Sequence, residues 1–182
     1  MKKLLIIVLL TGICASASYA QTLLQGEKTW YNIKRSLIPP YLTVTVINLL
    51  GADTLINGLT YRELLSATDS TLTQFTTYRF LRETADGKVY CRMPGPATDP
   101  EYLSYDFSAH LGDTIAYHPM SQPSVELEFV VTTEDSAFIG GRYWKQISRV
   151  FETWTEGMGS SGGLINNGLM GNLNDLMSSG AS

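Results

Sequence analysis

The three residue types of a hydrolytic triad occur close together at Asp106, Ser108 and His110. Their spacing of two places them on one face of a predicted strand, Tyr102–Leu111, because successive strand residues point to opposite faces. Alternate strand residues lie about 6.6 Å apart with parallel side chains, whereas a triad needs converging side chains about 3 Å apart. We therefore interpret these residues as a solvated polar face and predict no catalytic residues.

A metal site is conceivable at the two histidines, His110 and His118, which flank Asp113. A turn at Gly112-Asp113 would bring the flanking strands together, but the spacing typical of metal ligands is absent. Asp113 is better explained as a turn residue, and Cys91 as a small buried residue. We predict no metal and no other cofactor.

Trp154 and Glu156 are candidate ligand-binding residues, because a Trp and a Glu close together suit contacts with a sugar. Tyr102 is a third candidate, on the polar face of its predicted strand. The structural alternative is that Trp154 plugs one end of the core while Gly157 allows a sharp exit of the chain.

The elements that must position these residues are β-strands, because the dominant period of the sequence is two. Apolar side chains alternate with polar ones in Leu42–Val46, in Val125–Val131 and in Tyr102–Leu111. The only segment that could be helical, Leu59–Ala67, is also interpreted as a strand. The sequence predicts an antiparallel all-β domain, either a sandwich or a partly closed barrel built from hairpins.

Pairs of turn-forming residues separate the predicted strands at Asn57-Gly58, Asp86-Gly87 and Gly140-Gly141. These residues tolerate a positive φ, which two-residue hairpin turns require. The segment Asp53–Tyr61 also resembles Asp135–Tyr143. The resemblance fits either an internal duplication or two ordinary hairpins with similar turns.

The first 20 residues suggest export. A basic start, the apolar run Leu4–Leu10 and small residues near Ala20 predict a signal peptide over residues 1–20 that is cleaved before Gln21. We expect a single β domain over residues 21–156. Residues 157–182, rich in Gly, Ser and Asn, are expected to form a tail that is flexible or contributes a short docking element.

The charge of the chain argues against nucleic acid as a partner. Loss of Lys2 and Lys3 with the leader changes the formal net charge from −4 to −6, and no cluster of basic residues remains for a phosphate backbone. After leader removal no apolar run approaches the length of about 20 residues that spans a bilayer. The expected location is extracytoplasmic: secreted, periplasmic or on the outer surface.

A series of short motifs follows a definite order along the chain. They are Asp53-Thr54, Ile56-Asn57-Gly58, Tyr61, Asp86-Gly87-Lys88-Val89-Tyr90, Tyr105-Asp106-Phe107-Ser108, Gly112-Asp113-Thr114, Gly141-Arg142 and Trp154-Thr155-Glu156-Gly157-Met158-Gly159-Ser160. In this order they resemble a family of exported and mostly uncharacterised β-rich proteins from Bacteroidetes-type bacteria, many of which carry a sorting domain for type IX secretion. The similarity covers roughly residues 29–164. The resemblance implies an exported β module and no established reaction, ligand or catalytic residue.

The leading functional expectation is a non-enzymatic module for binding or surface assembly, with a polysaccharide, an envelope protein or a host surface protein as its partner. Such a module predicts an exposed aromatic patch. The alternative is a β-barrel carrier of a small apolar ligand, which predicts an enclosed apolar cavity. A hydrolase of unknown type is the third possibility and predicts converging acid, base or nucleophile side chains.

Overall fold

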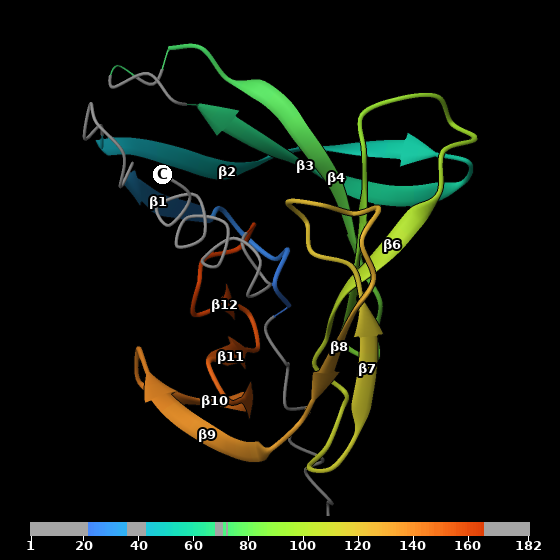
Figure 1. Ribbon diagram of the computed structural model, residues 1–182. Helices are drawn as coiled ribbons and strands as arrows, with labels where there is room; N and C mark the ends of the chain where they lie inside the picture. Colours follow the sequence, from blue (N-terminus) through green and yellow to red (C-terminus); the bar gives the residue numbers. More distant parts are fainter. Residues whose placement is uncertain (1–21, 36–42, 68–70, 72, 166–182) are drawn as a thin grey trace, which may run out of the picture.

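The computed structural model describes residues 22–35, 43–67, 71 and 73–165, and all the regular elements among them are β-strands (Figure 1). The prediction of an antiparallel all-β fold is confirmed. No helix long and apolar enough to cross a membrane occurs in this part of the chain. The strands are β1 (Thr29–Arg35), β2 (Thr43–Ile56), β3 (Leu59–Ala67), β4 (Thr76–Glu83), β5 (Lys88–Arg92), β6 (Glu101–Asp106), β7 (Thr114–Tyr117), β8 (Leu127–Val130), β9 (Thr133–Ile139), β10 (Arg142–Arg149), β11 (Glu152–Thr155) and β12 (Gly159–Ser160).

The strands form three antiparallel sheets. Strands β1 to β6 follow one another in a six-stranded meander that curls into a half-barrel. Strands β9 to β12 form a second sheet in the order β12-β11-β10-β9, and β7 pairs with β8 in a two-stranded ribbon. Figure 1 shows β7 and β8 below the six-stranded sheet on the right and the four-stranded sheet at the lower left.

The hairpin turns lie where the sequence predicts them. Asn57 and Gly58, with φ values of 51° and 78°, join β2 to β3, and Gly87, with a φ of 83°, lies between β4 and β5. Gly140 and Gly141, with φ values of 62° and 86°, join β9 to β10. Positive φ at both central residues is the geometry of a turn whose twist matches that of the paired strands.

One hydrophobic core joins the three sheets, and Trp154 of β11 lies in it. Its ring stacks on Phe129 at a centroid distance of 4.1 Å and meets the edges of Tyr105 and Tyr117 at 5.0 Å each. Trp154 has no exposed surface, and neither does Cys91 on β5. Aromatic rings at these distances and angles contribute about 0.5–1.5 kcal/mol per pair beyond their burial.

A buried carboxylate links this aromatic cluster to the end of β10. Glu152, with 6% of its surface exposed, accepts hydrogen bonds at Oε1 from the Trp154 indole N–H (2.9 Å) and the Ser160 hydroxyl (2.8 Å). Its Oε2 receives Arg149 at 2.8 Å, and Arg149 also donates to the Tyr117 hydroxyl at 2.9 Å. Burial raises the pKa of Tyr117 to about 12, with a further contribution from Glu152.

The packed part of the chain extends past residue 156, where we expected the domain to end. Gly159 and Ser160 form β12, and Leu164 and Ile165 are buried, with 0% and 6% of their surface exposed. The Tyr105 hydroxyl donates to the Leu164 carbonyl at 2.8 Å. The burial of these two apolar residues docks the segment against the core. The signal-peptide prediction for 1–20 and the rest of the expected tail, 166–182, lie outside the described residues.

Candidate functional site

The predicted polar face Asp106, Ser108 and His110 is not a face of one strand. Strand β6 ends at Asp106, whose Oδ1 accepts hydrogen bonds from the Ser108 backbone N–H, at 3.0 Å, and from its hydroxyl. His110 instead places Nδ1 3.0 Å from Glu134 Oε1. The strand predicted over 102–111 is therefore too long, because a local side-chain turn ends it. No hydrogen bond joins His110 to Ser108 or Asp106 among these interactions.

The two histidines also lie in separate settings. His118 packs its ring against Tyr102 at 4.9 Å and lies 3.6 Å from Glu126. Asp113 accepts the backbone N–H of His110 at 2.8 Å, as a turn residue does. Within the described ranges, no three His, Cys, Asp or Glu side chains lie close enough together to hold a metal ion.

The three candidate ligand-binding residues occupy different environments. Trp154 is fully buried and fills the core, as the structural alternative proposes. Tyr102 and Glu156 are half-buried, Tyr102 against His118 and Glu156 after the end of β11. Among the described residues, no hydrogen bond or ring contact joins any two of the three.

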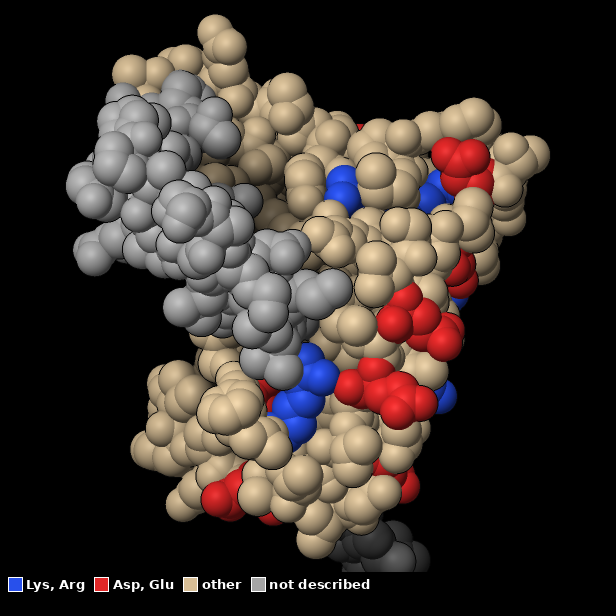
Figure 2. All heavy atoms as spheres, viewed as in Figure 1, with Lys and Arg blue, Asp and Glu red and all other residues tan. Residues whose placement is uncertain are grey.

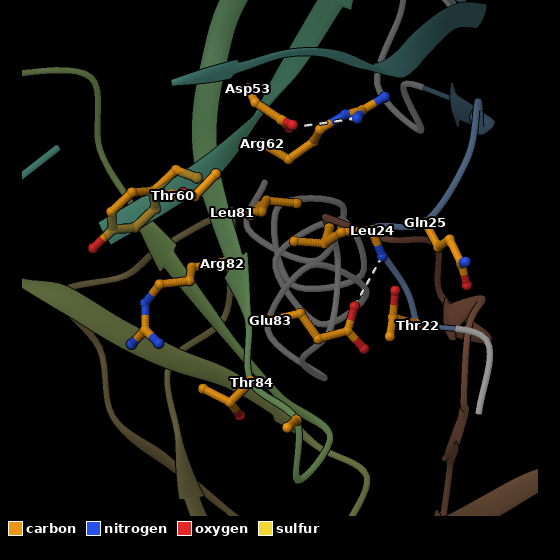
Figure 3. Close-up of a pocket in the computed structure, with 12 residues that line it drawn as sticks. Thr22, Leu24, Gln25, Asp53, Thr60, Arg62, Leu81, Arg82, Glu83 and Thr84 are labelled. Atoms are coloured by element: carbon orange, nitrogen blue, oxygen red, sulfur yellow. Dashed lines mark hydrogen bonds and ion pairs between the residues drawn. The ribbon is translucent and has the colours of Figure 1, made fainter. Parts of the chain in front are cut away.

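A pocket that the sequence did not reveal lies where β2, β3 and β4 meet the segment 22–28, which we call the strap (Figure 3). It is an open pocket of about 560 Å³, within the range of small-molecule sites. Figure 3 shows Leu24 of the strap beside Leu81 of β4, whereas Arg82 points away from the strap. The lining residues are Thr22, Leu24, Gln25, Asp53, Thr60, Tyr61, Arg62, Leu81, Arg82, Glu83, Thr84 and Ala85.

The strap is held firmly against β4. Leu23 is fully buried, and the Glu83 carboxylate accepts the backbone N–H groups of Leu23 and Leu24 at 3.0 and 2.9 Å. Lys28 Nζ donates to two strap carbonyls at 2.8 and 3.0 Å and to the Gly157 carbonyl at 2.8 Å. Burial raises the pKa of Glu83 and lowers that of Lys28. These contacts give the pocket one fixed wall.

The two arginines of the pocket differ in how they are bound. Arg82 is fixed by both carboxylate oxygens of Glu101, which also accepts the Tyr61 hydroxyl at 2.6 Å. Desolvation and this hydrogen bond raise the pKa of Tyr61. Arg62 makes only long contacts within the part of the chain that the structure describes, 3.4 Å to Asp53 and 3.5 Å to the Gly26 carbonyl. Its Nε is buried and has no acceptor among the described residues.

The most exposed aromatic pair lies at the tip of the β9–β10 hairpin. Phe138 and Tyr143 are 63% and 74% exposed and face one another across the two strands, with ring centroids 5.0 Å apart and the planes tilted by 55°. We call these two residues the aromatic pair. Large apolar side chains gathered on a surface are typical of interaction sites.

The charged side chains of the face drawn in Figure 2 are interspersed, with no continuous basic area. Acidic residues gather toward the right-hand edge, which corresponds to the position of β6 to β8 in Figure 1.

Sequence reasoning missed both the aromatic pair and the pocket. The Gly140-Gly141 turn, flanked on each side by an aromatic residue, is the signal that could have revealed the pair. The pocket has no such local signal, because its walls come from segments far apart in the chain.

Comparison of the chain with protein-family models, with curated proteins and with solved structures finds no match.

Proposed function

We propose that this protein is an exported, non-enzymatic module that binds a polysaccharide through its aromatic pair. The observation that carries the proposal is the exposure of Phe138 and Tyr143, which keep 63% and 74% of their surface accessible although they are large and apolar. Burying one such side chain against a ligand contributes about 1.5–3 kcal/mol. An exposed aromatic patch is also what the binding hypothesis expects.

The base of the hairpin tip supports the aromatic pair rigidly. Trp144 is only 9% exposed, and its indole N–H donates to the Ile139 carbonyl at 2.9 Å. The Arg142 guanidinium lies 3.5 Å from the centre of the Trp144 ring. Because the tip is already ordered, little conformational entropy is lost when a ligand binds there.

A polysaccharide suits the pair better than a purely apolar ligand. Sugar rings present C–H faces that pack on aromatic rings, and hydroxyls that need polar partners. Ser136 lies two residues before Phe138 on the same face of β9, opposite Lys145 of β10. The surface thus combines aromatic area with nearby hydrogen-bonding groups.

The two other functions receive less support. An apolar carrier needs an enclosed apolar cavity, but aromatic rings fill the space around Trp154, and charged side chains line the pocket. A hydrolase needs converging groups, but His110 bonds to Glu134, whereas Ser108 and Asp106 bond to each other in the turn after β6.

The test is a glycan array followed by titration calorimetry with the polysaccharide that binds most tightly. We expect the double variant Phe138→Ala/Tyr143→Ala to weaken binding at least about 30-fold, as loss of two aromatic contacts predicts, with an unchanged melting temperature. The matched control is Phe151→Ala, which removes an aromatic residue that is 78% exposed in the β10–β11 turn. Binding that survives in the double variant, or an array without any ligand, would overturn the proposal. Sequencing of the mature N-terminus tests export separately.

A further inference from the structure

We propose that the pocket between the strap and strands β2 to β4 is a second binding site, which takes the carboxylate of an acidic sugar on Arg62. This site is separate from the aromatic pair and does not depend on the function proposed for it. The pocket volume of about 560 Å³ accommodates a sugar of one or two rings.

Arg62 is the residue of the pocket that is free to bind a ligand. Its contacts to Asp53 and to Gly26, at 3.4 and 3.5 Å, are longer than the 2.7–3.2 Å of ordinary N–H···O hydrogen bonds. The ion pair with Asp53 is long and reaches solvent, with 26% of the Arg62 and 62% of the Asp53 side chain accessible, and ion pairs at a surface contribute little. Reorientation of the guanidinium toward a ligand therefore breaks no strong interaction.

The other charged groups of the pocket are already engaged. Arg82 is held by Glu101, and the oxygens of Glu83 are bound to backbone N–H groups of the strap. Arg62 is thus the lining cation whose planar donors can form a bidentate pair with a carboxylate. Asp53 and Glu83 repel a dianion such as phosphate more strongly than a carboxylate, which carries a single negative charge.

The rest of the lining fits a sugar ring. Gln25 and Thr60 are exposed and offer amide and hydroxyl groups for hydrogen bonds to sugar hydroxyls, whereas the Thr22 side chain is hydrogen-bonded to Glu83. Leu24, backed by Leu81, supplies an apolar surface for the C–H face of the ring (Figure 3). Because Glu83 and Lys28 anchor the strap, this surface is in place before a ligand arrives.

Titration calorimetry with galacturonate, galactose, acetate and inorganic phosphate tests the site on the full chain after removal of any leader. We expect galacturonate to bind saturably. Galactose and acetate should bind at least about tenfold more weakly, because galactose lacks the carboxylate and acetate lacks the sugar ring. A parallel titration with trigalacturonate shows whether the site prefers the free sugar acid or a sugar acid within a chain. The site is supported whichever of galacturonate and trigalacturonate binds more tightly. Failure of galacturonate to bind, or tighter binding of acetate or phosphate, would overturn the proposal.

Two variants locate the site. Arg62→Met keeps the aliphatic stem and should weaken galacturonate binding about tenfold or more, while Lys88→Met removes a cation outside the lining and should leave it unchanged. Equal binding by Arg62→Met and the unaltered protein contradicts the assignment. The double variant Phe138→Ala/Tyr143→Ala should bind galacturonate normally, so failure at one site is distinguishable from failure at the other.

Discussion

Removal of the buried carboxylate Glu152 should destabilise the domain strongly. The substitution Glu152→Ala leaves the Trp154 indole N–H and the Ser160 hydroxyl without their acceptor and separates Arg149 from its carboxylate partner. Breaking a buried ion pair by removing one partner costs about 3–5 kcal/mol. Arg149 keeps two neutral acceptors, the Glu128 carbonyl and the Tyr117 hydroxyl, so we expect the lower end, about 3 kcal/mol.

Urea unfolding followed by circular dichroism measures this loss as a lower midpoint at an unchanged slope. The matched control is Glu128→Ala, because that side chain is exposed and its change should stay within about 0.5 kcal/mol. A double-mutant cycle with Arg149→Met should return a coupling of about 1 kcal/mol or more between the two charged residues. A loss below about 1 kcal/mol for Glu152→Ala would falsify the view that this network stabilises the junction of β10 and β11.

Two further predictions concern the surface and the end of the domain. The pKa of Glu134 is lowered from 4.5 to about 2, first by the Leu111 backbone N–H and then by His110 and Lys145, so its carboxylate stabilises the folded state above the unfolded pKa. This contribution is lost as the pH falls from about 4.5 toward 2. In urea titrations, the difference in unfolding free energy between the unaltered protein and Glu134→Gln should therefore shrink between pH 6 and pH 3. A difference that stays constant over this range would contradict the stabilising role of the carboxylate. Leu164→Ala should lower the free energy of unfolding by about 2–5 kcal/mol, because Leu164 is fully buried, and a change below about 0.5 kcal/mol would show that the segment is not packed.

The fold class and the main hairpins could be predicted from the sequence because their signals are local. Asn57-Gly58 and Gly140-Gly141 tolerate the positive φ that two-residue hairpin turns require, so each pair predicts a turn between two alternating segments. The segment Leu59–Ala67, whose period is ambiguous, is a strand because it pairs on both sides, with β2 and with β4.

One strand boundary and the candidate site could not be predicted, for two different reasons: a local side-chain hydrogen bond sets the boundary, and contacts between distant residues form the pocket. The strand expected to reach Leu111 ends at Asp106, where a side chain competes for the backbone N–H of Ser108. Leu111 is 64% exposed although it continues the apolar alternation. The pocket needs Arg62 and the strap side by side, and no pattern along the chain places them there.

Strand β5 carries the only cysteine of the described ranges, in the interior of the half-barrel. Burial excludes reagents from Cys91 and raises the pKa of its thiol, so the reactive thiolate is scarce in the native protein. Alkylation by iodoacetamide under native conditions therefore measures how often the half-barrel opens around β5. In the chain without residues 1–20, which contain Cys14, the substitution Tyr143→Cys would place a thiol at an exposed position that accepts a fluorophore long before Cys91 reacts, so the hairpin tip can be labelled at a single site.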